Sequence, residues 1–201
     1  MSEAGGAREP RGWNPDDRPD AEVRRRDRSR DDGWIRAFLR AAPWGVLATL
    51  RDGRTFLNPN IFVYDAGRHA LYLHTARVGR TRTNVEGEAR VSFTAAAVGR
   101  LLPADTALEF SVEYASVVVF GRGSVVEDDS EARAALEALL QKYAPHLEAG
   151  RDYRAVVPEE LARTTVLRVE IDGWSGKEKA AAEAFPGAFR LPEPEIPFRP
   201  G

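Results

Sequence analysis

The sequence predicts a mainly β protein, in which six antiparallel strands form a small barrel with helices at its periphery. Turn signals such as Asp52-Gly53 join apolar, alternating runs directly, which is typical of hairpins. Long helical patterns occur at only two places, at the start of the ordered chain and before the last strand. Strands do not alternate with helices, so a doubly wound nucleotide-binding fold is not expected. A hairpin-joined sheet that closes on itself removes its exposed edges, and this favours the barrel.

Two helices are predicted from capping residues and apolar spacing. Asp31 or Asp32 begins the first helix, Pro43 marks its end, and its apolar face is formed by Trp34, Ile35, Phe38 and Leu39. The acidic segment Glu127–Ser130 begins the second helix, whose apolar stripe is formed by Leu136, Leu139, Leu140 and Tyr143. After this helix, Pro158 begins a short helical turn.

The six strands are predicted from apolar runs bounded by turn residues. Pro59 indicates an edge or a bulge in the second strand, because proline cannot donate to the strand ladder. Gly121 and Gly123 allow a bend or bulge in the long fifth strand. The strands are expected over residues 44–50, 55–64, 70–74, 89–96, 111–126 and 165–171.

The composition is that of a globular protein with one well-filled core. The 201 residues are 43% hydrophobic and 30% charged, and the net charge is -2. A nucleic-acid binder would need a local basic patch, because the chain as a whole is not basic. The absence of cysteine excludes disulfides, thiolate zinc sites and a cysteine nucleophile. No apolar run approaches the roughly 20 residues of a membrane span, and we expect a cytoplasmic protein without membrane or nucleic-acid partners.

Changes in composition along the chain predict three segments. Residues 1–30 are rich in Gly, Pro, Asp and Arg, with almost no large apolar group besides Trp13. Such a segment buries too little surface to offset the entropy of ordering, so it is expected to be a flexible arm. Its arginine cluster either touches an acidic partner or leads, solvated, into the first helix. Residues 31–180 hold the folded domain, and residues 181–201 form an irregular tail.

The segment from Leu71 to Val85 is the most informative part of the chain. An alternating, strand-like run leads into a turn around Gly79 that carries three arginines and three hydroxyl side chains. From Val85 onwards the sequence resembles the opening of a short helix. Backbone N–H groups at a helix start, hydroxyls and guanidinium groups all favour a bound phosphate. The segment is therefore either a phosphate-binding loop or a solvated basic surface loop.

Two further segments carry polar groups beside apolar strands. Tyr114 and Ser116 lie two residues apart on a core strand, so both point to the same face. They line a pocket, or else an edge-strand face that touches water. Trp174–Lys177 comes directly after the last predicted strand and combines an aromatic plane, a hydroxyl and a cation. That combination suits a flat, anionic ligand, and it equally suits a turn at a strand end.

These motifs occur together in a recognisable order and spacing. They are His74-Thr75-Ala76, then Gly79-Arg80-Thr81 with Asn84, then Glu113–Val117 with Gly121, then Trp174–Lys177. In this respect the chain resembles the pyridoxamine 5'-phosphate oxidase-like flavin-binding split-barrel superfamily, over about residues 26–187. It looks closest to the branch of nitroimidazole-resistance and flavin-nucleotide-binding proteins. The resemblance implies a six-stranded antiparallel split barrel of the FMN-binding type, which forms a homodimer with a flavin site in each interface groove.

The resemblance also implies roles for individual residues. The loop from Thr75 to Asn84 would hold the phosphate of FMN, with Arg80 against it and Arg77 and Arg82 as alternatives. Residues 58–62 would run past the flavin ring through backbone contacts. The expected cofactor-binding residues are Asn58, Asn60, Ile61, Phe62, His74, Thr75, Ala76, Gly79, Arg80, Thr81, Asn84, Tyr114, Ser116, Trp174 and Lys177.

One residue is a candidate for catalysis. A histidine matches His74 in nitroimidazole-resistance relatives, and its side chain faces either the ligand or the core. No His–His–carboxylate spacing indicates a metal, and Glu109 and Glu113 are not expected to act as an acid–base pair. The leading interpretation is an FMN-dependent oxidoreductase for a small organic molecule, such as a nitroaromatic, in which the flavin carries the redox chemistry. The alternative is a flavin carrier, store or sensor without turnover, or a protein that binds haem or a deazaflavin.

Overall fold

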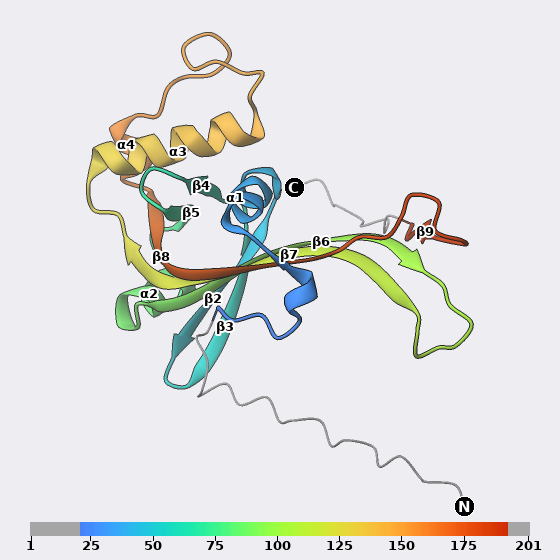
Figure 1. Ribbon diagram of the computed structural model, residues 1–201. Helices are drawn as coiled ribbons and strands as arrows, with labels where there is room; N and C mark the ends of the chain where they lie inside the picture. Colours follow the sequence, from blue (N-terminus) through green and yellow to red (C-terminus); the bar gives the residue numbers. More distant parts are fainter. Residues whose placement is uncertain (1–20, 193–201) are drawn as a thin grey trace, which may run out of the picture.

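The computed structural model describes residues 21–192 and has one antiparallel sheet with helices around it (Figure 1). Trp13 and most of the expected arm lie outside the described residues. The helical segments are η2 (Arg26–Arg28), α1 (Asp32–Ala41), α2 (Arg80–Gly87), α3 (Asp129–Tyr143) and α4 (Pro158–Leu161). The strands are β1 (Ser29–Arg30), β2 (Gly45–Arg51), β3 (Arg54–Asn60), β4 (Val63–Asp65), β5 (Ala70–Ala76), β6 (Arg90–Leu102), β7 (Ser111–Val125), β8 (Thr164–Lys179) and β9 (Phe189–Arg190).

The sheet curls into a split barrel, which confirms the predicted fold class. Its strand order is β3-β2-β6-β7-β8-β5-β4, with β1 added to β8 and β9 added to β6. The two ends of this path, β3 and β4, are consecutive in the chain and are joined by Ile61 and Phe62 alone. The short link brings the sheet edges together around a core in which Phe62 meets Phe93 edge-on, with ring centroids 4.7 Å apart.

Three strands differ from their predicted bounds by more than two residues. The strand expected over 55–64 is divided at residues 61–62, where the fully buried Phe62 turns into the core. β6 continues to Leu102, and β8 continues to Lys179, well past the predicted end at Ile171. Trp174–Lys177 therefore lies within a strand and forms no turn. A bulge makes this continuation possible, because Phe120 pairs with Gly173 while Gly121 pairs with Ile171, which leaves one extra residue on β8.

The first helix has the predicted cap and the predicted apolar face. The Asp31 side chain accepts a hydrogen bond from Trp34 N at 2.9 Å, and Ile35 and Leu39 are buried. Gly176 lets this helix approach β8 closely, because a Cβ at that position would lie 2.7 Å from Ile35 Cγ1. The glycine of the Trp174–Lys177 motif thus serves helix packing.

The long helix α3 covers β4 and β5 (Figure 1), and its buried face overlaps only in part with the predicted apolar stripe. Asp128 caps it by accepting from Glu131 N at 2.7 Å. The buried residues are Ala132, Ala135 and Leu139, whereas Leu140 is exposed. Small alanines form the contact face, which places the helix backbone near the sheet. Leucine spacing alone could not indicate that face.

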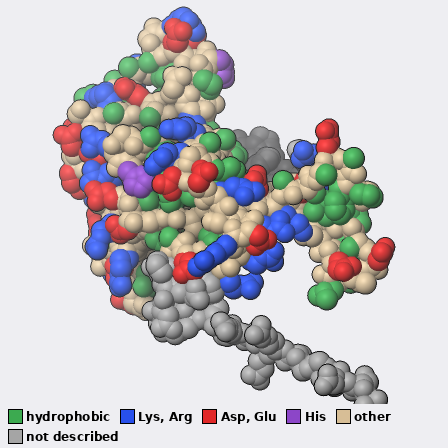
Figure 2. Space-filling view, in the orientation of Figure 1, with side chains coloured by type: hydrophobic (Ala, Val, Ile, Leu, Met, Phe, Trp, Pro, Cys, Tyr) green, Lys and Arg blue, Asp and Glu red, His purple; other side chains and the backbone are tan. Residues whose placement is uncertain are grey.

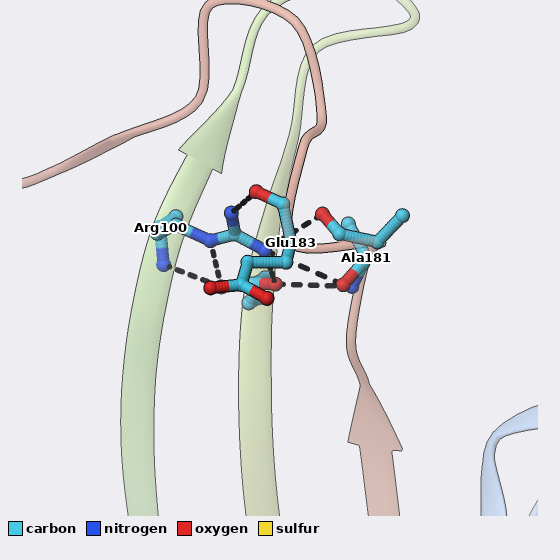
Figure 3. A network of polar contacts seen from close by, with 5 residues as sticks. Arg100, Ala181 and Glu183 are labelled. Atoms are coloured by element: carbon cyan, nitrogen blue, oxygen red, sulfur yellow. Dashed lines mark hydrogen bonds and ion pairs between the residues drawn. The ribbon is translucent and has the colours of Figure 1, made fainter.

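The β6–β7 hairpin extends far beyond the barrel and carries the C-terminal segment with it (Figure 1). Arg100 on β6 forms a two-pronged ion pair with Glu113 on β7, with two N···O distances of 2.7 and 2.9 Å. Arg100 also donates to the carbonyls of Ala181, Ala182 and Glu183, while Ala181 N donates to Glu113 (Figure 3). This network holds the start of the expected tail against the hairpin. Further along the tail, β9 pairs with β6 and adds a second attachment.

Candidate functional site

The helix α2 follows β5 after a three-residue turn and begins at Arg80. This is five residues before the predicted start at Val85, so the prediction of a loop up to that point was wrong. The residues that α2 buries are Thr81, Asn84 and Val85. Because two of these three are polar, the first turn has no apolar periodicity by which the sequence could have revealed it.

At the N-terminus of α2, the first backbone donors have no capping partner within residues 21–192. Gly79 occupies the cap position and offers no side-chain acceptor, whereas Asp31 and Asp128 cap α1 and α3. The first backbone bond within the helix runs from Thr83 N to Gly79 O, at 3.1 Å. The N–H groups of the three preceding residues therefore have no helical acceptor, and they carry the positive end of the helix dipole.

Gly79 opens space beside these donors. Its backbone is extended, with φ 163° and ψ 165°, so it makes no left-handed turn of the kind that requires glycine. A Cβ at this position would meet nothing within 4 Å. The gap in front of the helix is thus open to a ligand group.

Arg80 is the exposed cation of this helix start. Its guanidinium lies 5.1 Å from the centre of the Phe56 ring, a cation–π distance. With the β2–β3 hairpin it lines a groove of about 480 Å³, whose other walls include Arg51, Arg54 and Asn84. Arg51 and Arg54 flank the Asp52-Gly53 turn, and nothing in the sequence places that hairpin beside α2.

The other two arginines of the segment differ from Arg80. Arg82 is largely buried and donates to Glu86 Oε1 at 2.7 Å and to Thr165 Oγ1 at 3.2 Å, so it holds α2 in place. Arg77 is exposed, and within residues 21–192 its side chain has no polar partner. Of the three candidates for a phosphate, only Arg80 both lines the groove and lacks an acidic partner among the described residues.

Asparagine side chains close the seam between β3 and the β5–α2 corner. Asn58 donates to Thr81 Oγ1 at 3.1 Å, and Asn60 donates to the backbone carbonyl of His74 at 2.9 Å. Asn84, which is buried, donates to Thr49 Oγ1 at 2.9 Å. These predicted site residues do come together, with Thr75 and Ala76 at the end of β5 beside them, and their amides fix the seam.

His74 does not share the groove with Arg80. Strand alternation puts its side chain on the same face of β5 as Ala70 and Tyr72, which α3 and α4 cover, whereas Leu71 and Leu73 face the barrel core. Its Nδ1 atom is buried and has no hydrogen-bond partner among the described residues. Phe62 is likewise withdrawn from the surface, while its neighbour Ile61 is exposed.

The remaining predicted residues lie away from Arg80, on the two opposite faces of the sheet at β7 and β8. Trp174 Nε1 donates to Asp32 Oδ1 at 2.9 Å, and the indole packs edge-on against His69. Lys177 pairs across the strands with Ser116, and its Nζ lies 6.0 Å from the centre of the Tyr114 ring. None of these side chains lines the groove beside α2. Within one chain, the predicted site is thus divided into three groups: the residues beside α2, Trp174 with its partners, and Lys177 with Tyr114 and Ser116.

Glu113 has a structural role and is unsuited to proton transfer. The ion pair with Arg100 and the N–H groups of Ala181 and Arg100 hold the pKa of this carboxyl well below its usual range. A carboxylate that stays ionised under these contacts does not act as a general acid or base at neutral pH. This agrees with the expectation that Glu109 and Glu113 form no acid–base pair.

On the face of the molecule seen in Figure 2, acidic and basic side chains are interspersed.

A single curled antiparallel sheet with the start of α2 at its seam makes this chain a split-barrel protein. Residues 31–178 match the family model described as pyridoxamine 5'-phosphate oxidase. The chain belongs to this family. Among curated proteins, none matches the chain. No helix of the described part of the chain is long and apolar enough to cross a membrane.

Solved structures with the same fold have low sequence identity to this chain. The flavocytochrome Anf3 from Azotobacter vinelandii superposes with a TM-score of 0.71 at 22% identity, over 90% of this chain and 87% of that one. A protein from Mycobacterium smegmatis described as binding FAD and heme has a TM-score of 0.67 at 26% identity, over 75% and 72%. A candidate 5-nitroimidazole antibiotic resistance protein from Bacteroides thetaiotaomicron has a TM-score of 0.60 at 21% identity, over 74% and 84%.

Proposed function

We propose that the protein binds a flavin whose phosphate lies against the N-terminus of α2. The observation that carries this proposal is the uncapped start of α2, with Gly79 leaving open space and Arg80 lining the groove beside it. Three backbone donors and one guanidinium suit a phosphate better than any neutral group. The descriptions of similar structures as a flavocytochrome and as an FAD- and heme-binding protein support the same ligand class.

FMN is the flavin that we expect, with FAD as the second candidate. Arg80 and the N–H groups of α2 supply donors for one phosphate, as FMN requires. Arg51 and Arg54 continue the groove along the β2–β3 hairpin, and they would suit the additional phosphate of FAD. Release of the bound ligand and its identification by mass distinguishes the two, because FAD carries an adenylyl group that FMN lacks.

We further propose that the flavin-loaded protein is an oxidoreductase for a small organic molecule, for which nitroaromatics are candidates. The flavin would supply the transfer of electrons, and the protein would bind and orient it and exclude water. Bleaching of the flavin absorption by a reduced nicotinamide nucleotide, followed by recovery when an acceptor is added, is the expected result. Bleaching without recovery across a panel of acceptors would favour a carrier or sensor.

Haem is an alternative ligand because two similar structures are described as a flavocytochrome and as binding heme. Of the three described histidines, His146 is exposed in the loop after α3, and the two nearer the barrel are not free for such a role without rearrangement. His69 packs against Trp174, and the Nδ1 atom of His74 is buried. The absorption spectrum of the purified protein decides this point, because haem gives an intense Soret band that flavins lack.

We propose that the protein acts as a homodimer, with the outer face of its sheet as the interface. Leu57, Ala48, Ser92 and Phe120 form a continuous cross-strand row on β3, β2, β6 and β7, opposite to the buried face. Leu57 at one end of the row is 59% exposed. A second copy on this face would bring the Tyr114–Lys177 group of one chain towards the α2 groove of the other. A two-fold arrangement of this kind uses one patch twice.

Replacing Leu57 with glutamate should convert the dimer to a monomer. A charge buried in an apolar interface loses its hydration, whereas on a monomer the same side chain remains in water. Sedimentation at micromolar concentration should give twice the 22.2 kDa chain mass for the parent and the single mass for the variant. The matched control is Leu147→Glu, an exposed leucine in the loop after α3. A parent that sediments as a monomer with flavin bound would refute the dimer.

A further inference from the structure

The end of α3 contacts the link between β3 and β4 through two consecutive side chains. The Tyr143 hydroxyl accepts a hydrogen bond from Phe62 N at 3.1 Å and donates one to Phe62 O at 3.0 Å. Lys142 Nζ donates to the same carbonyl at 3.0 Å and to Leu39 O, near the end of α1, at 3.3 Å. Its ammonium also lies 3.8 Å from the centre of the Phe62 ring.

These contacts replace the strand pairing that Phe62 lacks. Phe62 lies between β3 and β4, so it belongs to neither strand ladder, and it is fully buried. A buried backbone N–H or C=O without a partner is costly, and here both partners come from α3. The Phe62 ring is packed against Phe93, so the residue cannot shift to find other partners.

Fixing Phe62 also fixes the exposed segment before it. Residues 58–61 are tied at one side by Asn58 and Asn60, which bond to Thr81 and to the carbonyl of His74. At its other end the segment is held by Phe62, whose backbone bonds to Lys142 and Tyr143. A displacement of the end of α3 would therefore be transmitted to the segment that passes from β3 into β4, beside the seam.

We propose that Lys142 and Tyr143 are positioning residues, which hold the backbone at Phe62 and so set where residues 58–61 lie beside the ring of the bound flavin. The proposal rests on the proposed function, taken with the expectation from the family resemblance that residues 58–62 run past the flavin ring. Neither side chain is expected to touch the flavin. Their effect passes through the backbone of Phe62.

Lys142 bears its charge without a carboxylate among its described contacts. Burial lowers the pKa of Lys142 to about 8. The ionisable groups on the elements around it are Tyr143 on α3, whose pKa burial raises, Arg40 on α1, and Tyr64 on β4, over whose ring Arg40 lies. A basic group with a lowered pKa makes the folded state bind fewer protons than the unfolded state. Its contribution to stability is therefore smallest below pH 8 and grows as the pH rises from 8 towards 10.5.

The direction of this pH dependence distinguishes a role of Lys142 in positioning the flavin segment from a role in stabilising the fold. Above pH 8 the folded state should gain stability from the loss of the Lys142 charge. In the same range the attraction of Lys142 for the two carbonyls and the Phe62 ring weakens, so the segment should be held less firmly. The parent protein should therefore bind riboflavin more weakly at pH 9 than at pH 7, and Lys142→Arg, which stays charged, should show a smaller decrease.

The test uses Lys142→Met and Tyr143→Phe, with Gln141→Met as the matched control. Gln141 is the exposed neighbour of Lys142 on α3. Each test variant should weaken binding of both riboflavin and FMN by about fivefold to twentyfold, because hydrogen bonds that position the ring segment are lost. The ratio of the two affinities should stay at the parent value, since the phosphate end is untouched. Lys142→Met should melt near or above the parent temperature, because it removes a half-buried charge that has no carboxylate partner among the described residues, while the control should match the parent in every measurement.

Two results would overturn the inference. The first is parental riboflavin affinity and an unchanged flavin absorption spectrum in both Lys142→Met and Tyr143→Phe, which leaves the proposed function intact. The second, which holds even where a variant fails to fold, is a parent riboflavin affinity that does not change between pH 7 and pH 9. A parent that binds no flavin at all would overturn the proposed function together with this inference.

Discussion

Replacing Arg80 with alanine should weaken FMN binding by about tenfold to a hundredfold and leave riboflavin binding almost unchanged. A hydrogen bond to a charged group contributes roughly 1.5–3 kcal/mol, and Arg80 is the exposed guanidinium beside the free N–H groups of α2. Riboflavin lacks the phosphate, so it makes no use of this side chain. Titration of both ligands by flavin fluorescence measures the contrast.

The structure selects the control for this experiment. Arg77→Ala removes an exposed arginine three residues away whose side chain has no polar partner within residues 21–192, so it should bind FMN as the parent does. Arg82→Ala is less suitable, because Arg82 holds α2 through Glu86 and Thr165 and its loss disturbs the helix itself. A variant with impaired folding would lose riboflavin and FMN alike.

Two outcomes would count against the phosphate site. If Arg77→Ala weakens FMN binding and Arg80→Ala does not, the phosphate lies in the turn before α2 and not at its first residue. If neither change matters, the N-terminus of α2 binds no phosphate. A loss that is equal for riboflavin and FMN would show that Arg80 acts on the fold, through its contact with Phe56.

Replacing Gly121 with alanine should lower the free energy of unfolding by about 3 kcal/mol or more. A Cβ at this position would lie 2.1 Å from the carbonyl oxygen of Glu170 and 3.1 Å from its carbonyl carbon. Both atoms belong to the backbone of β8, so the clash cannot be relieved by turning a side chain. The β7–β8 pairing at the bulge has to open instead.

Thermal unfolding provides the measurement for Gly121→Ala. For a chain of this length, 1 kcal/mol corresponds to about 2–4 °C, so a decrease of roughly 6–12 °C is expected. Gly87→Ala is the matched control, because a Cβ there meets nothing within 4 Å and alanine suits the end of α2. It should be neutral or slightly stabilising. Equal melting temperatures for Gly121→Ala and the parent would show that β7 and β8 are not held as closely as the structure has them.

The sequence was sufficient for the features that depend on local chemistry. Asp31 and Asp128 mark helix starts because their side chains accept from backbone N–H groups three residues on. The Asp52-Gly53 turn sets the β2–β3 hairpin, where both residues have positive φ. Apolar alternation and hairpin spacing then sufficed for an antiparallel barrel, since such a sheet leaves few other ways to bury its apolar face. The segment from Thr75 to Asn84 was also identified as the one richest in phosphate donors.

The arrangement of that segment was decided by tertiary contacts. α2 begins at Arg80 because Thr81 and Asn84 find buried hydrogen-bond partners on β3 and β2, and polar anchors of this kind leave no periodic apolar pattern. Tertiary contacts also distinguish Arg80 from Arg82 as the phosphate ligand. Only the fold brings Thr165 to Arg82, which ties that side chain down. Lys142 gave no signal in the sequence, and Tyr143 was predicted only as a member of an apolar stripe. Their role arises because chain closure brings the end of α3 against an unpaired residue that lies about 80 positions earlier.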